Sequence, residues 1–417
     1  MKFCNLDVYL HNRLAGKLRQ GEGGRLDFAY DSAYVIDKAA HPLSVSMPLS
    51  GAVYDDAVAR PYFSGFLPDD LIRHRLAEFF GVSEKNEFAL LREVGGECAG
   101  AVALYPEGEK PLDVASDDFE ILDERKLAKY LDALHSRPLL AGSEGLRLSL
   151  AGAQDKLPVA LKDGHIALAK GGSPTTHIIK PPIERVSDSV YNELFCLKLA
   201  ARLRLPVVRA ELGFADGNPY LLVERYDRAL DGNGRIRRLH QEDFCQALSI
   251  APEQKYEREG GPGVARCLEL LERSSAQPAV DKLFFLKMLI FNYLIGNADC
   301  HGKNFSLLHN NGNSRLAPAY DLMCTAAYPG AQKKLAMKIG GTYDPDLIFR
   351  RHWHRLVADT AVARRSMERN LNDMAAEVGR GYAELVRDFA AQGVVSGIFD
   401  DIGRVIELRT RQLLEAY

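Results

Sequence analysis

The chain has 417 residues, of which 47% are hydrophobic and 26% are charged, and its formal net charge is −3. A chain of this length can bury two or three cores, and the composition is ordinary for a globular protein. The small net charge excludes a general attraction to nucleic acid or to an anionic membrane, so any DNA contact requires a local basic patch or a basic partner.

The cysteine pattern and the N-terminus indicate where the protein works. Seven cysteines are scattered without a C-x-x-C pair, which predicts free thiols in a reducing cytoplasm. The first ten residues alternate too soon with charge for a signal peptide. The longest uncharged part of the most apolar run, 288–298, is far shorter than the roughly 20 residues of a membrane helix. We therefore expect a cytoplasmic protein without membrane contacts.

The first hundred residues predict a small α+β unit. A hairpin is expected over 3–10 and 15–20, and the alternating apolar residues near 26–35 extend its sheet. Amphipathic helices follow near 69–80 and 86–94, and then a glycine-rich turn and the strand 101–104. This unit closes at about residue 108.

The rest of the chain changes from strand-rich to helical. Between 117 and 230 we expect one long helix, 188–203, and four strands, 156–162, 165–169, 175–180 and 219–225. Helical periods dominate from about 238, and residues 281–295 are apolar on nearly every face, which predicts a central buried helix. The predicted fold class is therefore α+β, with an N-terminal α+β subdomain (1–108), a strand-rich lobe (109–228) and a mainly helical lobe (229–417). The last two together have the two-lobed layout of a protein kinase.

The segment after the predicted buried helix has the spacing of a kinase catalytic loop. Asp299 and Asn304 stand in a D-x-x-x-x-N pattern, in which the Asp accepts the proton of the substrate hydroxyl and the Asn holds Mg²⁺. Asp321, further along, is placed to supply a second metal carboxylate. Lys303 offsets charge on the transferred phosphoryl group, whereas His301 is equally well explained as a packing residue. The spacing alone carries little weight, because such a pair arises by chance about once in a chain of this length.

A candidate ATP site precedes this loop. The β-branched run 177–180 ends in Lys180, as in the strand whose lysine reaches the α- and β-phosphates in kinases. Glu193 lies 13 residues later on the predicted helix, where a kinase carries the carboxylate that pairs with this lysine. The alternative for Lys180 is an ordinary surface lysine at the end of a strand.

Two further segments complete the candidate ATP site. Small residues at 151–153, between predicted strands, allow backbone N–H groups to approach phosphate oxygens, although a hairpin turn would look the same. The strand 219–225 runs into charged residues, and backbone groups of Glu224 and Tyr226 at this junction are placed to bind adenine. A strand that simply leaves the core for solvent would give the same pattern.

These segments together resemble the HipA family of toxin kinases, nearly from end to end. The segments that carry the resemblance are FLPDD (66–70), GECAGAV (96–102), LSLAGAQDK (148–156), PTTHIIK (174–180), NELFCLKLA (192–200), LLVERYDR (221–228), HQEDFCQ (240–246), KYEREGGPG (255–263), GNADCHGKNFS (296–306) and PAYDL (318–322).

The resemblance implies an ATP- and Mg²⁺-dependent serine/threonine-protein kinase with Asp299 as catalytic base and Asn304 and Asp321 as metal ligands. It also implies autophosphorylation at Ser149, which ejects the phosphate loop and silences the enzyme. The ATP-binding residues that it implies are Ala151, Gly152, Ala153, Gln154, Asp155, Lys156, Lys180, Glu224, Arg225, Tyr226, His301, Gly302, Lys303, Asn304, Tyr320 and Asp321.

The resemblance also implies partners. Family members are toxins of type II toxin–antitoxin pairs and bind a helix-turn-helix antitoxin (HipB-like), which places the complex on operator DNA as a corepressor. The best-known members phosphorylate aminoacyl-tRNA synthetases, which gives an expected substrate class. The basic cluster 349–355 is a further candidate for phosphate contacts, although a solvated helix face explains it better.

Two other functions remain open from the sequence. A small-molecule phosphotransferase of kinase-like fold shares the D-x-x-x-x-N loop. A corepressor with a silent kinase site is the third hypothesis, and the intact set of Lys180, Asp299, Asn304 and Asp321 argues against it.

Overall fold

A computed structural model describes residues 4–111, 118–232 and 235–415. By its internal contacts the chain divides into two compact units. Unit 1 contains the residues up to Pro181 together with 213–253 and 306–314, and unit 2 contains 182–212, 254–305 and the residues from Arg315 onward. The predicted division at 108 and 228 stays a prediction.

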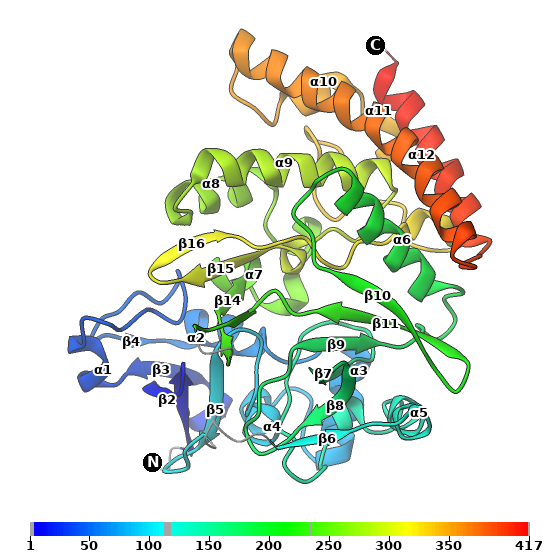
Figure 1. The fold of residues 1–417 in the computed structure, drawn as a ribbon. Helices are drawn as coiled ribbons and strands as arrows, with labels where there is room; N and C mark the ends of the chain where they lie inside the picture. The colour runs from blue at the N-terminus through cyan, green and yellow to red at the C-terminus, as the bar shows by residue number, and fades with distance from the viewer. Residues whose placement is uncertain (1–3, 112–117, 233–234, 416–417) are drawn as a thin grey trace. The chain divides into compact units, whose positions relative to one another are not determined.

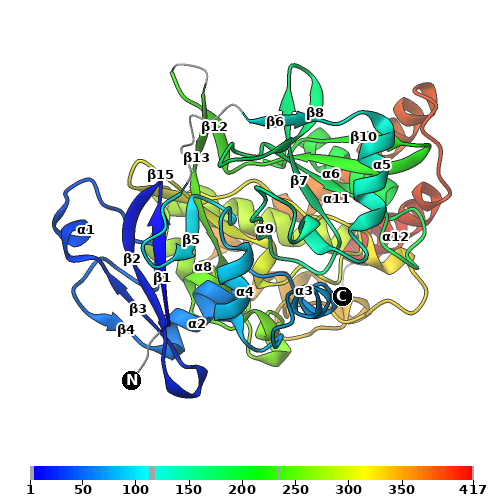
Figure 2. The ribbon, with the colours of Figure 1, turned by 90° about the horizontal axis from the view of Figure 1, so that it is seen from below.

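Unit 1 begins with an antiparallel sheet of strand order β4-β3-β2-β1-β5. Helix α2 contacts β3 and helix α4 contacts β5, so that both lie beside this sheet (Figures 1 and 2). The strands are β1 (Cys4–Leu10), β2 (Arg13–Gln20), β3 (Leu26–Tyr30), β4 (Val53–Tyr54) and β5 (Val102–Pro106), and the helices are α1 (Ser32–Ile36), α2 (Asp56–Ser64), α3 (Asp70–Phe80) and α4 (Glu87–Val94).

The predicted hairpin and the two amphipathic helices are confirmed, but the strand expected near 26–35 is too long. It ends at Tyr30 because the Asp31 side chain accepts hydrogen bonds from the N–H groups of Ala33 and Tyr34 and starts helix α1. The helix α4 begins in the same way, with the Asn86 side chain accepting from Ala89 N–H. Buried side chains such as Phe28, at 0% exposure, form the core of this region.

A second sheet contributes the strand-rich part of the chain, in the order β10-β11-β9-β7-β8-β6. All four predicted strands are present here, as β7 (Leu157–Lys162), β8 (His165–Ala169), β9 (His177–Lys180) and β11 (Asn218–Glu224). The sequence patterns missed the edge strands β6 (Phe119–Ile121) and β10 (Ala210–Ala215) and the helix α5 (Glu124–Ala133). Helix α5 starts at Asp123, whose side chain accepts from Lys126 N–H.

The expectation that helices dominate from residue 238 is incomplete. A small sheet of order β14-β15-β16 lies within this part of the chain, and the two-stranded ribbon of β12 and β13 precedes it in the sequence. The elements are β12 (Arg228–Leu230), β13 (Ile236–Arg238), β14 (His240–Asp243), α7 (Phe244–Ala247), β15 (Ser306–Asn310) and β16 (Asn313–Leu316). These strands have only three to five residues, so they show no clear period in the sequence.

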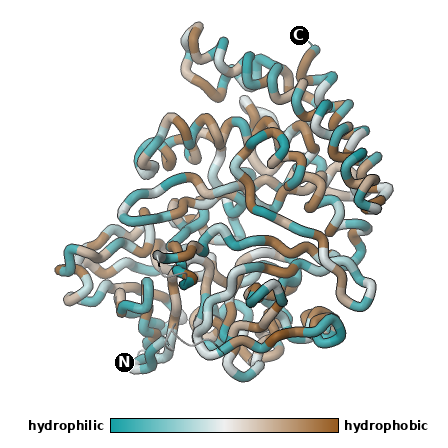
Figure 3. Tube along the Cα trace, viewed as in Figure 1, coloured by the Kyte–Doolittle hydropathy of each residue, from teal (hydrophilic) through white to brown (hydrophobic). Residues whose placement is uncertain are grey.

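Unit 2 is mainly helical. Its helices are α6 (Ser189–Arg202), α8 (Val264–Ser274), α9 (Pro278–Leu294), α10 (Arg350–His354), α11 (Ala361–Ala391) and α12 (Ile398–Leu414). The predicted buried helix is α9, which starts with Pro278, where no N–H partner is needed. Helix α11 alternates between hydrophobic and hydrophilic residues along its length (Figure 3), and it contacts α6, α9 and α12. None of the described helices combines the length and apolar composition required to cross a membrane.

Candidate functional site

The predicted phosphate loop lies in unit 1 and starts from a buried residue. Ser149 is 0% exposed, its Oγ donates a hydrogen bond to Phe66 O at 2.8 Å, and its N–H donates to Glu97 O at 2.9 Å. The hydroxyl is therefore enclosed by the N-terminal part of the chain. Autophosphorylation of Ser149 stays a prediction, and it would require a conformation in which this loop has moved.

Two side chains later in the loop, Gln154 and Asp155, are bound by residues outside it. Arg75 binds both carboxylate oxygens of Asp155, at 2.9 and 3.0 Å, and Gln154 Nε2 donates to Pro181 O at 2.9 Å. Gly152 has φ +114, a backbone conformation that residues with a side chain rarely adopt, so the turn requires glycine. The loop is thus a defined turn rather than an open chain. Phosphate binding by residues 151–156 stays a prediction.

Lys180 ends β9, as predicted, and is only 7% exposed. It lies opposite Leu221 of β11, and Glu224 lies opposite His177 in the same ladder. The lysine strand and the predicted hinge strand are therefore neighbours in one antiparallel ladder, in which the end of β11 lies opposite the start of β9. Glu193 is 3% exposed on α6 of unit 2, and its ion pair with Lys180 stays a prediction.

The predicted hinge is held by hydrogen bonds to neighbouring residues. The N–H of Arg225 donates to Thr176 O at 2.9 Å, and the hydroxyl of Tyr226 donates to Gln241 Oε1 at 2.6 Å. The guanidinium of Arg225 is buried against Asp227, at 3.0 and 2.8 Å. Arg225 can therefore bind adenine only through its backbone carbonyl, since its N–H and its side chain already have hydrogen-bond partners.

A buried ion cluster, which the sequence patterns did not reveal, lies behind the hinge. It consists of Glu97, Arg225, Asp227 and Arg228, with Arg228 Nη2 2.6 Å from Glu97 Oε1 and Nη1 2.9 Å from Asp227 Oδ2. Burial alone would raise the pKa of Glu97, but the guanidinium groups of Arg228 and Arg225 outweigh it and hold that pKa below its ordinary value. Since the backbone carbonyl of Glu97 also accepts the N–H of Ser149, this one residue connects the predicted hinge to the predicted phosphate loop.

The predicted catalytic loop lies in unit 2 and follows the end of α9. The chain turns at Gly296, which has φ +71, and a Cβ there would meet Val405 Cγ1 at 2.5 Å. Asn297 Oδ1 then accepts the N–H of Asp299 at 3.0 Å, and Asn297 Nδ2 donates to Asn292 Oδ1 at 2.7 Å. Asp299 is exposed between buried neighbours, as a base that must meet an external hydroxyl should be.

The predicted metal ligands follow on the same loop and on the next segment. Asn304 Oδ1 accepts the N–H of His301 at 3.0 Å, which fixes the amide but leaves a lone pair on its oxygen. Tyr320 donates through its hydroxyl to Lys303 O at 2.8 Å and so ties the Asp321 segment to the catalytic loop. Asp321 is exposed and has φ +52, a strained conformation for a non-glycine residue. An amide oxygen and a carboxylate are ligands that Mg²⁺ prefers, so the donor set fits this ion.

One residue near the loop, Tyr256, was not predicted as a site residue, and it contacts His301, which was. His301 is buried at 6% exposure, and its ring meets the edge of Tyr256 at a centroid distance of 5.2 Å. The Tyr256 hydroxyl in turn donates to Asp299 Oδ1. The segment KYEREGGPG carried part of the family resemblance, but nothing in its spacing indicates that its tyrosine contacts Asp299, 43 residues away.

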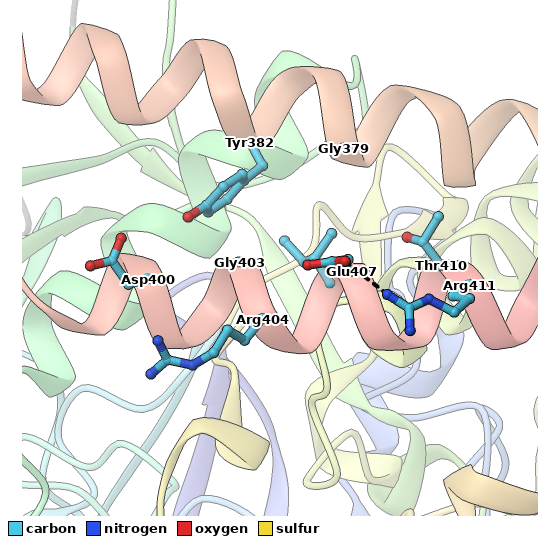
Figure 4. Close-up of a pocket in the computed structure, with 9 residues that line it drawn as sticks. Gly379, Tyr382, Asp400, Gly403, Arg404, Glu407, Thr410 and Arg411 are labelled. Atoms are coloured by element: carbon cyan, nitrogen blue, oxygen red, sulfur yellow. Dashed lines mark hydrogen bonds and ion pairs between the residues drawn. The ribbon is translucent and has the colours of Figure 1, made fainter.

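Two pockets in the described part of the chain lie apart from the predicted site residues or only border them. A cavity of about 330 Å³ in unit 1 touches Glu97, Arg147 and Leu148, just before Ser149. An open groove in unit 2 lies between α11 and α12, where Tyr382 and the ion pair of Glu407 with Arg411 line it (Figure 4). No predicted site residue lines this groove, so its role is separate from the predicted chemistry.

Comparison with protein families gives two matches that together cover most of the chain. The model of the HipA-like C-terminal domain matches residues 148–382, and that of the HipA N-terminal domain matches residues 6–105. The first of these contains the whole of the predicted site. Both matches agree with the resemblance expected from the motifs.

Individual relatives are similar over nearly their full length. A putative kinase, Y4mE, of Sinorhizobium fredii is 43% identical over 386 residues, which are 92% of this chain and 92% of the relative. The serine/threonine-protein kinase toxin HipA of Shewanella oneidensis is 28% identical over 396 residues, 92% of this chain and 90% of that protein.

A solved structure is similar as well. The Shewanella oneidensis HipA of a complex of HipA, HipB and operator DNA has a TM-score of 0.83 and 26% identity, and the match covers 98% of this chain and 97% of that one. The predicted α+β class and the enzyme class, a serine/threonine-protein kinase, are confirmed by these relatives. This chain belongs to the HipA family.

Proposed function

We propose that this chain is the toxin of a type II toxin–antitoxin pair and acts by Mg·ATP-dependent phosphorylation of serine or threonine in a protein. The observation that carries this proposal is the geometry around Asp299. A buried helix ends in a glycine turn, the next residues are fixed by backbone hydrogen bonds, and the one exposed side chain among them is a carboxylate. This arrangement supports a base that receives a proton from an external hydroxyl.

The reaction follows from these positions. Asp299 takes the proton of the acceptor hydroxyl as its oxygen attacks the γ-phosphorus, and the bond from that phosphorus to the β,γ-bridging oxygen breaks to release ADP. Lys180 and Lys303 offset the charge of the phosphates. Asn304 and Asp321 would hold Mg²⁺, which neutralises charge on the phosphate oxygens when bound. Glu193 is proposed to orient Lys180, and the backbone of residues 224–226 to hold adenine.

The burial of Ser149 supports the proposed self-inhibition. A phosphoserine carries nearly two negative charges and does not fit where the hydroxyl is enclosed by Phe66 O and the Glu97 backbone. Phosphorylated Ser149 would therefore keep the loop 149–156 out of its position. A loop in that state cannot cradle the phosphates of ATP.

The proposed partners follow from the similar complex. The Shewanella oneidensis protein was solved with HipB and operator DNA, which supports a helix-turn-helix antitoxin and a DNA-bound corepressor role for this chain. An aminoacyl-tRNA synthetase is the proposed substrate class. Phosphoproteomics of cells that express the wild type or Asp299→Asn identifies the substrate as a protein whose phosphorylation requires Asp299.

The direct test is phosphoryl transfer by purified protein from [γ-³²P]ATP. We expect Asp299→Asn to bind ATP like the wild type but to transfer phosphate about 10²–10⁴-fold more slowly, the range for a lost general base. Asp373→Asn removes an exposed carboxylate of α11 without a hydrogen bond in the described residues and serves as the matched control. Unchanged autophosphorylation by Asp299→Asn would contradict the proposal.

Two other results would favour the other functions. A phosphorylated metabolite without any phosphoprotein would indicate a small-molecule phosphotransferase. Failure of the wild type to bind Mg·ATP at millimolar concentration would indicate a corepressor with a silent site.

A further inference from the structure

The carboxylate of Asp299 has a single hydrogen-bond partner in the described part of the chain. The hydroxyl of Tyr256 donates to Oδ1, and Oδ2 accepts no hydrogen bond from residues 4–111, 118–232 or 235–415. The main chain of Asp299 is fixed, since its N–H is bound by Asn297 and its carbonyl accepts the N–H of His301 at 2.9 Å. Tyr256 is therefore the group that sets the direction of the side chain.

The ring of Tyr256 is itself held from several directions. The His301 ring meets it edge-on, with 83° between the planes and 5.2 Å between centroids. The Arg258 guanidinium lies 4.9 Å from the ring centroid, and Arg258 Nη2 donates to Gln332 Oε1 at 2.5 Å. A ring fixed by an aromatic contact and by a cation over its face presents its hydroxyl in one position.

The backbone on both sides of Tyr256 is anchored as well. Lys255 O accepts the N–H of Gly302 in the catalytic loop at 3.3 Å, and Glu257 N–H donates to Ala336 O at 3.1 Å. Glu257 Oε2 also accepts the N–H of Lys338 at 2.6 Å. The turn that carries Tyr256 is thus bound to the catalytic loop on one side and to the segment 336–338 on the other.

Glycine makes this turn possible. Gly260 has φ +105, and a Cβ on Gly261 would lie 2.5 Å from Gln254 O. The N–H of Gly261 returns to Tyr256 O at 2.9 Å. The glycines of KYEREGGPG therefore hold the chain in a tight turn, at the start of which the tyrosine is fixed.

We infer that Tyr256 is a positioning residue for Asp299: its hydroxyl binds Oδ1 and leaves Oδ2 directed at the acceptor hydroxyl. The inference rests on the proposed function, in which Asp299 is the base. An exposed carboxylate without this contact rotates about two side-chain bonds, and a base displaced by about 1 Å can lose as much as 10²-fold in rate. Because Tyr256 occupies one oxygen only, the other stays available to the substrate.

The test uses Tyr256→Phe, which keeps the ring against His301 and Arg258 and removes only the hydroxyl. Transfer of phosphate to dephosphorylated casein and to the chain itself is measured over a range of Mg·ATP concentrations. We expect kcat to fall about 10- to 100-fold, with the KM for ATP and the melting temperature within error of the wild type. Tyr343→Phe is the matched control, since Tyr343 is also a half-buried tyrosine near a lysine, Lys338, and its hydroxyl has no hydrogen bond in the described residues.

The outcomes separate this inference from the proposed function. Wild-type kcat in Tyr256→Phe, together with an inactive Asp299→Asn, overturns the inference and leaves the proposed function intact. A raised kcat also overturns it, because the hydroxyl would then block the base. An active Asp299→Asn, or a wild type that phosphorylates neither acceptor, overturns both. In an Asp299→Asn background the Tyr256→Phe change should have no further effect on transfer, since the two groups act as a unit.

Discussion

Replacing Gly296 by alanine should damage the catalytic loop at its first turn. Gly296 has φ +71 directly after α9, and a Cβ there would lie 2.5 Å from Val405 Cγ1 and 2.8 Å from the Cβ of Ala326. The left-handed conformation costs alanine about 1–2 kcal/mol, and the overpacked contacts cost about 1–3 kcal/mol more. Alanine also has less backbone entropy than glycine in the unfolded chain, which offsets this cost by less than about 1 kcal/mol.

The net loss is therefore about 2–4 kcal/mol of unfolding free energy. In a unit of 150–250 residues each kcal/mol lowers the melting temperature by about 2–4 °C, so a decrease of roughly 5–15 °C is expected. Differential scanning calorimetry of the purified protein measures it. The rate of phosphoryl transfer should also decrease, because the turn at Gly296 positions Asp299.

The matched control is the same substitution in a different place. Gly379 lies in the long helix α11 with no atom within 4 Å of an added Cβ. Alanine there should raise stability by about 0.5–1 kcal/mol, because glycine is unfavourable inside a helix. A Gly296→Ala protein as stable as the wild type, or shifted in the same direction as Gly379→Ala, would refute this explanation of the turn.

Three further predictions concern unit 1. Ser149→Asp places a carboxylate where a buried hydroxyl now donates to a carbonyl, so the loop 149–156 should become accessible to protease and ATP affinity should fall at least 10-fold in calorimetric titration. Glu97→Gln should lower the unfolding free energy by about 3 kcal/mol in urea, because Arg228 then loses a buried partner. Burial, and to a lesser degree the neighbouring His309, holds the pKa of His240 well below its ordinary value, so the folded protein keeps this imidazole neutral while the unfolded chain takes up a proton. The unfolding free energy should therefore be highest above about pH 6.5, and below that pH this group lowers it by about 1.4 kcal/mol per pH unit. In denaturant unfolding at pH 5, 6 and 7, His240→Asn should remove this part of the pH dependence.

Each of these predictions has a clear contrary result. A protected loop and unchanged ATP binding in Ser149→Asp would mean that the site accommodates charge. Glu97→Gln at wild-type stability would show that Asp227 alone is sufficient for the two arginines. A pH slope that persists in His240→Asn would assign the acid sensitivity to other groups.

Much of the local structure could be predicted from the sequence, because its signals repeat within a few residues. The all-round apolar run at 281–295 predicted helix α9, and β-branched runs with turn residues between them predicted β7, β8, β9 and β11. The spacing of Asp299 and Asn304 belongs to one short loop. Elements of three to five residues, such as β6 and β14, were missed because they span too little chain to show a period.

The amino-acid sequence by itself determined the α+β class and the family and predicted the chemistry of the site, since a motif needs only residue types at fixed separations. Only the tertiary structure decided how the side chains of the site are held. Glu97 and Arg228 are 131 residues apart, and Tyr256 and Asp299 are 43 apart. Such pairs depend on which distant segments pack together, and many alternative partners of the same type are present in the chain. The contact between Tyr256 and the proposed base Asp299 is therefore set by the tertiary structure, although both residues can be read from the sequence.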